Sequence, residues 1–276
     1  MESFKIAVCQ MRVIDDKDVN LEKAVDLLEE SALNDAHLAV LPEMFNCPYD
    51  TEKFPQYAEN RKNSKTLKII SKTARKCGIY LVAGSIPESS GGNIYNTSFI
   101  FNPQGDIIGS HRKLHLFDID VPDGVTFKES ETLKSGNEIT IIETDFGKLG
   151  VAICYDIRFP ELLRLMALEG VNTMVVPGAF NMTTGPAHWE TLIRSRAIDN
   201  QFFMAAASPA RDENASYVAY GHSIIVDPWG DILAQAGSGE EIIYASINYH
   251  RTKEVRRQLP VLKNRRLDLY DLKIKK

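Results

Sequence analysis

The stretch Phe4-Lys5-Ile6-Ala7-Val8-Cys9-Gln10-Met11 decides the fold, because it opens a unit of strand, helix and strand. Its apolar residues predict a strand, and residues 18–34 predict a helix whose apolar face holds Leu21, Ala24, Val25, Leu28 and Ala32. The next apolar run, residues 37–41, predicts a second strand that ends at Pro42-Glu43. This order of elements is typical of two parallel strands joined by a crossover helix.

The second half of the chain follows the same order. Residues 148–154 predict a strand, 160–169 a helix that stops before Gly170, and 173–176 a strand that again ends in proline. The helix lengths differ and no residue-level repeat is visible. We therefore expect two related halves rather than copies of one sequence.

Further elements complete the expected fold. Ser64 and Gly78 predict the start and stop of a helix over 64–77, and the turn 102–106 predicts a hairpin between strands 94–101 and 107–113. The remaining periodic segments predict strands at 79–85, 139–144, 202–207, 220–226, 231–236 and 242–247, and helices at 186–200 and from residue 251. We expect one α/β domain over residues 1–276, with a core at about 4–248 and sheets covered by helices. The polar, basic tail, 259–276, is expected to lie across a surface or to reach a neighbouring subunit.

Composition narrows the class of protein. The 276 residues include 32 Lys and Arg against 37 Asp and Glu, a net charge of −5, and 44% are hydrophobic. This balance excludes a wholly disordered chain and argues against nucleic acid as a partner. No run approaches the roughly 18 apolar residues of a membrane span, and the first residues do not resemble a signal peptide. We therefore expect a cytoplasmic protein with reduced thiols, although a mitochondrial fraction remains open.

The four cysteines differ in their surroundings. None has CxxC spacing, so zinc and thioredoxin-like interpretations have no support. Cys154 lies between a predicted strand and a predicted helix, where helix amides stabilise a thiolate and a backbone N–H can hold an oxyanion. The alternative is a small core residue, which is what the patterns around Cys9 and Cys77 indicate. Cys47 lies in a predicted loop and has no assigned role.

A reactive thiol needs a base and a group that stabilises charge. Glu43 follows a strand end, and Lys113 closes the strand 107–113; the alternatives are a solvated loop acid and an exposed basic run. The histidines have no metal-ligand spacing, and His111 and His115, four apart, make at most two ligands. We therefore expect no metal, while a papain-like Cys/His pair stays open.

Three motifs together resemble the nitrilase superfamily, the carbon-nitrogen hydrolases. They are Leu41-Pro42-Glu43-Met44-Phe45, His111-Arg112-Lys113-Leu114-His115-Leu116, and residues 150–161, GVAICYDIRFPE. The resemblance extends from about Phe4 to Tyr270 and implies a four-layer α-β-β-α sandwich. It also implies an amidase that needs no metal or organic cofactor.

The resemblance also implies a role for each site residue. Glu43 would be the general base and Cys154 the nucleophile, while Lys113 and the backbone N–H of Tyr155 would hold the oxyanion. Glu129 would be a second acid that orders the site; the alternative is a turn acid.

Within the superfamily, several segments resemble the omega-amidase branch, which hydrolyses the terminal amide of α-ketoglutaramate and α-ketosuccinamate. These segments are residues 45–49, 115–122, 178–181, 184–190 and 208–212. The resemblance implies that Arg158 binds the substrate carboxylate and that Phe180, Thr184 and Tyr49 line the pocket; guanidinium geometry suits a carboxylate. Arg158 could instead pair with Glu161.

Three further expectations accompany this interpretation. A deaminated-glutathione amidase is the alternative enzyme, and a ligand-binding or interaction scaffold is the alternative outside enzymes. His188, Trp189 and His222 are expected to be structural supports. Similar proteins pair through helices near the active site, so we expect a homodimer.

Overall fold

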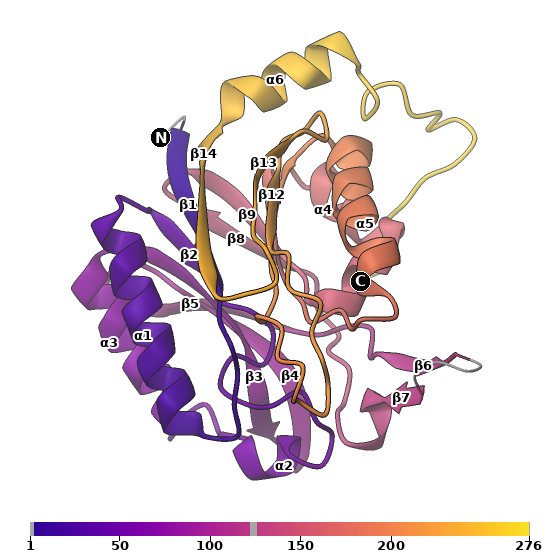
Figure 1. The fold of residues 1–276 in the computed structure, drawn as a ribbon. Helices are drawn as coiled ribbons and strands as arrows, with labels where there is room; N and C mark the ends of the chain where they lie inside the picture. The colour runs from indigo at the N-terminus through magenta and orange to yellow at the C-terminus, as the bar shows by residue number, and fades with distance from the viewer. Residues whose placement is uncertain (1–2, 122–125, 276) are drawn as a thin grey trace.

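Two six-stranded sheets lie face to face in the computed structural model, which describes residues 3–121 and 126–275 (Figure 1). The first sheet has the order β14 (Glu241–Asn248), β1 (Ser3–Gln10), β2 (Leu38–Val40), β3 (Tyr80–Ser90), β4 (Asn93–Phe101) and β5 (Ile107–Arg112). The second has the order β13 (Ile232–Gln235), β12 (Ile224–Val226), β11 (Phe203–Ala207), β10 (Thr173–Pro177), β9 (Gly147–Val151) and β8 (Thr140–Thr144).

The two sheets share one pairing pattern. From β14 to β5, the successive pairs are antiparallel, parallel, parallel, antiparallel and antiparallel. The pairs from β8 to β13 follow the same sequence of directions. The expectation of two related halves is therefore confirmed at the level of topology.

Helices cover the outer faces of both sheets. The pair α1 (Lys17–Leu33) and α3 (Lys65–Cys77) packs on the first sheet, and α4 (Pro160–Leu168) and α5 (Gly185–Asn200) pack on the second. The other helical elements are α2 (Phe54–Tyr57), α6 (Tyr249–Gln258) and the 3-10 helices η1 (Glu129–Glu131) and η2 (Cys154–Arg158). The expected α-β-β-α sandwich is confirmed. No helix in the described ranges has both the length and the apolar character that crossing a membrane requires.

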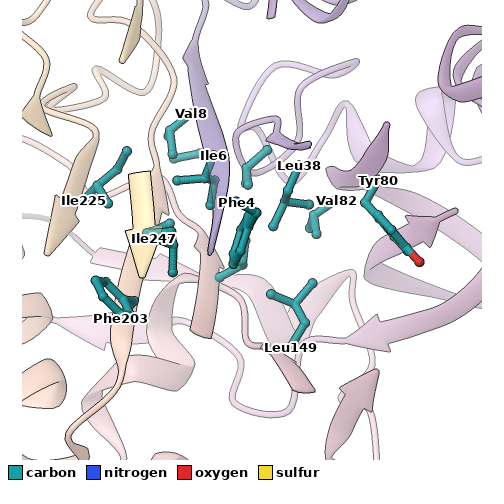
Figure 2. Close-up of a cluster of buried hydrophobic side chains, with 14 of the residues drawn as sticks. Phe4, Ile6, Val8, Leu38, Tyr80, Val82, Leu149, Phe203, Ile225 and Ile247 are labelled. Carbon is teal, nitrogen blue, oxygen red and sulfur yellow. The ribbon is translucent and has the colours of Figure 1, made fainter. Parts of the chain in front are cut away.

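Side-chain alternation explains how β1 connects two cores. Ile6 and Val8 point between the sheets, where Figure 2 shows them near Leu149 and Ile225 of the opposite half. Their neighbours in β1 point the other way, toward α1 and α3. Since successive strand residues face opposite sides and both sides are buried, the strand is almost continuously apolar.

Local end signals act as predicted in α3. The Ser64 hydroxyl accepts a hydrogen bond from the Leu67 N–H, and Gly78 follows the helix in the left-handed conformation at φ +66°. Both groups satisfy or replace backbone partners that a helix end lacks.

The structure corrects several predicted boundaries. Strand β3 continues to Ser90 instead of stopping at Ser85, across an irregularity at Gly84, and β12 begins at Ile224 instead of Tyr220. Strand β9 ends at Val151, so Cys154 opens η2 rather than ending a strand. Helix α2 and the hairpin of β6 (Asp118–Asp120) and β7 (Thr126–Lys128) had no periodic signal, because each is too short.

The tail has no helix or strand over residues 259–275, and most of it is exposed. Leu262 packs against the core under α4 and α5, and the Gln201 side chain donates to the Leu259 carbonyl. The expectation that the tail lies across a surface is confirmed for these residues. Pro122, the last residue of one family-like segment, and Met1, Glu2 and Lys276 lie outside the described residues.

Candidate active site

Strand ends from both sheets deliver the candidate residues to one place. Glu43 follows β2, Lys113 follows β5, and Cys154 follows β9. Ala179 follows β10, and its N–H donates to the Glu43 carboxylate at 2.8 Å across 136 positions of sequence. The site therefore needs both halves of the chain.

A cation and two carboxylates form the centre of the site. The Lys113 Nζ lies 3.0 Å from Glu43 Oε1 and 2.9 Å from the Glu129 carboxylate, and all three side chains are fully buried. Tyr49 donates its hydroxyl hydrogen to Glu129, and Lys113 donates to the Tyr49 oxygen at 3.2 Å. The Phe117 N–H donates to the other oxygen of Glu129 at 2.7 Å. The alternatives of an exposed Lys113 and a solvated turn acid at 129 are thus wrong.

The Glu43 carboxylate accepts hydrogen bonds from several parts of the chain. Besides Lys113 and the Ala179 N–H, the Asn96 side-chain amide donates to Oε1 at 2.8 Å. A close backbone approach supports this position: a Cβ on Gly84, at φ +30°, would lie 2.0 Å from the Pro42 carbonyl oxygen. Only glycine fits there, because the bulge in β3 presses against the residue that precedes Glu43.

Cys154 lies in a strained and crowded turn. Its φ is +47°, a left-handed conformation that is rare for residues with a side chain, and the residue is 3% exposed. Gly178 makes room for it, because a Cβ there would lie 3.4 Å from the Cys154 Cα and 3.0 Å from the Trp189 ring. The Cys154 side chain lies close enough to Glu43 to lower the pKa of that carboxyl group, against the larger effect of burial.

Burial and charge decide where the protons reside. Burial, reinforced by the Glu43 charge, raises the pKa of the Cys154 thiol well above its usual value, so the resting sulfur is protonated. Burial also raises the pKa of Glu43, although Lys113 opposes it. Burial lowers the pKa of Lys113, but the carboxylates of Glu129 and Glu43 outweigh it and hold this pKa above its usual range. The arrangement offers a protonated nucleophile, an adjacent proton acceptor and a permanent cation.

Tyr49 and Tyr217 form the wall between an inner and an outer pocket. The inner pocket is lined by Glu43, Cys47 and Ala179, among others, and the outer by Phe127 and Asn181, while both tyrosines line both pockets. Their rings are 4.5 Å apart, and the Tyr217 hydroxyl donates to the Ala179 carbonyl. Sequence reasoning missed Tyr217, because it lies in a loop without periodicity or a motif.

Arg158 lies beside the site with unused hydrogen-bonding capacity. Its guanidinium carbon is 4.8 Å from the centre of the Phe180 ring, and Nη1 lies 3.2 Å from His188 Nδ1. The Nε atom is buried without a hydrogen-bond partner. Within the described ranges, the side-chain partner of Arg158 is His188 and no ion pair joins Arg158 to Glu161.

The other predicted pocket residues lie close by. Tyr155 belongs to η2, next to Cys154, with its ring centre 5.2 Å from that of Phe117 and the Arg158 guanidinium 5.7 Å away. The Thr184 hydroxyl donates to Asn181 Oδ1. Tyr155 thus precedes α4 and Thr184 precedes α5 along the chain.

The remaining cysteines and histidines have structural partners. Cys9 is buried as predicted, Cys77 is only half-buried, and Cys47 is buried at the inner pocket. His111 and His115 both contact Asp156. In the part of the chain that the structure describes, no group of three or more His, Cys, Asp or Glu side chains is arranged so that it could hold a metal ion.

Comparison with known proteins gives first the class and then the relatives. Residues 5–257 match the carbon-nitrogen hydrolase family, so the chain belongs to this family and is an amidohydrolase. The chain is 53% identical over 272 residues to omega-amidase NIT2 of Danio rerio, covering 99% of this chain and 98% of the relative. It is 48% identical to omega-amidase NIT2 of Homo sapiens over 276 residues, the full length of both.

Solved structures agree with this assignment. Nit3 of Saccharomyces cerevisiae, a member of branch 10 of the nitrilase superfamily, has a TM-score of 0.89 and 45% identity, covering 96% of this chain and 97% of that chain. The NitFhit protein of C. elegans has a TM-score of 0.91 and 33% identity, covering 100% of this chain and 68% of the longer protein. The resemblance inferred from the three motifs is therefore confirmed.

Proposed function

We propose that this protein is an omega-amidase that hydrolyses the terminal amide of small dicarboxylate monoamides such as α-ketoglutaramate and α-ketosuccinamate. The observation that carries this proposal is that Glu43, Lys113 and Cys154 are buried together, with Lys113 paired to Glu43 and a partly unpaired arginine four positions after Cys154. The names of the relatives support the same activity.

The first half of the reaction forms a thioester. Glu43 takes the proton of Cys154 as the sulfur attacks the amide carbon, and the carbonyl oxygen becomes an oxyanion. Lys113 and the Tyr155 N–H stabilise this charge, which is worth most in a site without water. Glu43 then returns the proton to the nitrogen, the carbon–nitrogen bond breaks, and ammonia leaves.

The second half consumes water. Glu43 accepts a proton from a water molecule whose oxygen attacks the thioester carbon, and Lys113 again stabilises the oxyanion. Collapse breaks the carbon–sulfur bond, and the proton on Glu43 restores the thiol as the carboxylate product leaves. Glu129 assists by holding Lys113 and Tyr49 in place, a role supported by its three contacts.

Arg158 supplies the preference for an anionic substrate. Its buried Nε has no hydrogen-bond partner, and its guanidinium lies over the Phe180 ring. Phe180, Thr184 and Tyr49 are the residues expected to line the pocket for the carboxylate. Replacing Arg158 with methionine removes charge-assisted hydrogen bonds worth about 1.5–3 kcal/mol, so kcat/KM for α-ketoglutaramate should fall about 10- to 150-fold. A neutral amide should be affected far less, and Arg194→Met on the exposed face of α5 serves as the control.

Two measurements separate the alternatives. Ammonia release should be far faster from α-ketoglutaramate than from deaminated glutathione, and the opposite ranking would overturn the substrate assignment. Intact-mass detection of a substrate adduct on Cys154 distinguishes an enzyme that works through this thiol from a binding scaffold. Turnover that persists undiminished in Cys154→Ala would refute the mechanism.

We further infer that residues 1–276 act as one domain in a cytoplasmic homodimer. Both sheets contribute to one site, and apolar side chains of the tail, including Leu267 and Leu269, are exposed. Gel filtration should give a particle of twice the 31.0 kDa chain mass, and a particle of one chain mass would contradict the dimer.

A further inference from the structure

Asp156 carries a fully buried carboxylate and lies two positions after Cys154 in the same 3-10 helix, η2. Its Oδ1 accepts hydrogen bonds from the backbone N–H of His115 at 2.9 Å and from His115 Nδ1 at 2.8 Å. Its Oδ2 accepts from the Ile153 N–H at 3.0 Å and from His111 Nε2 at 3.1 Å. Although burial opposes ionisation, the bonds from the two histidines hold the pKa of Asp156 well below its usual value.

These four bonds use the whole acceptor capacity of an ionised carboxylate, which has no hydrogen to donate. Both histidines must therefore donate to Asp156 through the nitrogen that faces it. His111 and His115, four positions apart, converge because the Asp156 carboxylate lies between them.

The donors come from the two segments that carry the reactive groups. His111 and His115 flank Lys113 by two positions on each side, while Ile153 and Asp156 enclose Cys154. Lys113 follows β5 in the first sheet, and Cys154 follows β9 in the second. Asp156 thus ties the lysine segment to the cysteine turn across the sandwich.

We propose that Asp156 is a positioning residue that sets the Cys154 thiol against Lys113 and Glu43. The proposal rests on the roles proposed above for those three side chains. Four bonds to one carboxylate hold the turn in which Cys154 keeps its unfavourable φ of +47°. Without them, the turn relaxes and the sulfur moves away from the base and the cation.

Asp156→Asn tests this role with almost no change of shape. The asparagine amide replaces one carboxylate oxygen with an NH2 group, which cannot accept a hydrogen bond. In either orientation this NH2 group faces a backbone N–H, of Ile153 or of His115, which then has no acceptor. Because that buried N–H loses its acceptor, the Cys154 turn shifts and kcat should fall about 10- to 100-fold. KM should change by a smaller factor than kcat, because Arg158 keeps its own contacts with His188 and Phe180. Alkylation of Cys154 by iodoacetamide, followed by peptide mapping, should slow by a similar factor.

Asp227→Asn is the matched control. Asp227 is also buried and lies in the turn between β12 and β13. It accepts hydrogen bonds from the N–H groups of Trp229 and Asp231 and from the Arg251 side chain. Asp227→Asn should lower the melting temperature about as much as Asp156→Asn does. It should leave kcat and the rate of Cys154 alkylation within about twofold of the wild-type values. Equal effects of both variants on kcat would reduce Asp156 to a stabilising residue and overturn the proposal.

His115→Phe is a second variant at a partly exposed position. It keeps the stacking on Phe159, whose ring centre is 3.6 Å away, and removes only the Nδ1 donor. A severalfold loss of kcat and of alkylation rate is expected, and unchanged rates would overturn the proposal even if Asp156→Asn does not fold. Alkylation needs no amide substrate, so a wrong substrate assignment and a wrong role for Asp156 give different results.

Discussion

Replacing Lys113 with methionine removes the cation that contacts both Glu43 and Glu129. Methionine keeps the length and apolar stem of lysine, so the change is mainly electrostatic. At 3.0 Å and an effective dielectric of about 20, one such pair is worth roughly 5 kcal/mol of Coulomb attraction. Removing one partner of a buried pair typically costs about 3–5 kcal/mol, because an uncompensated charge remains. We therefore expect the unfolding free energy of Lys113→Met at pH 8 to be about 3–5 kcal/mol below that of the wild type.

The loss should depend on pH in a defined direction. The pKa of Glu43 is already raised by burial from its ordinary value of about 4.5, and Lys113 is the group that lowers it most. Without Lys113 this pKa rises further, so the folded variant binds more protons than the unfolded chain above pH 4.5. Stability of the variant therefore decreases as pH rises through that window, and it should be greater at pH 5.5 than at pH 8.

Urea denaturation at both pH values measures the stability, and ammonia release measures catalysis. Loss of an oxyanion donor should reduce kcat by about 10²- to 10³-fold. Lys65→Met is the control, because Lys65 pairs with Asp18 at an exposed position and should change neither quantity measurably. A Lys113→Met protein with wild-type stability at pH 8, or with wild-type kcat, would refute the electrostatic role of Lys113.

Three further outcomes are expected. In the pH profile of kcat/KM, the midpoint on the acid side should lie above pH 4.5, because Glu43 must be ionised to act as the base and its pKa is raised. A midpoint at or below pH 4.5 would contradict this role. Gly84→Ala should cost more than 2 kcal/mol in urea denaturation, because its Cβ meets the Pro42 carbonyl, whereas Gly91→Ala, also at positive φ but with open space around it, should cost about 1 kcal/mol. Tyr217→Phe should lower kcat about 3- to 10-fold by removing one hydrogen bond beside Glu43, and equal rates in steady-state assays would exclude this contribution.

Local signals explain what could be predicted without coordinates. Two-residue alternation and apolar runs located most strands, and Ser64 and Gly78 located both ends of α3, because these signals act within a few residues. The order of elements predicted two related halves, and three short motifs placed Glu43, Lys113 and Cys154 among the candidates. Motif spacing said nothing about burial.

The sequence by itself therefore determined the class of fold, the family and the candidate residues. Only the tertiary structure decided that Lys113 is enclosed by two carboxylates, that Arg158 keeps a free donor, and that Asp156 joins the segments that carry Lys113 and Cys154. The physical reason is distance along the chain. The Lys113 contacts join residues 16 to 70 positions apart, where strand ends of the first sheet and η1 meet. The Asp156 contacts exist because the two sheets pack face to face.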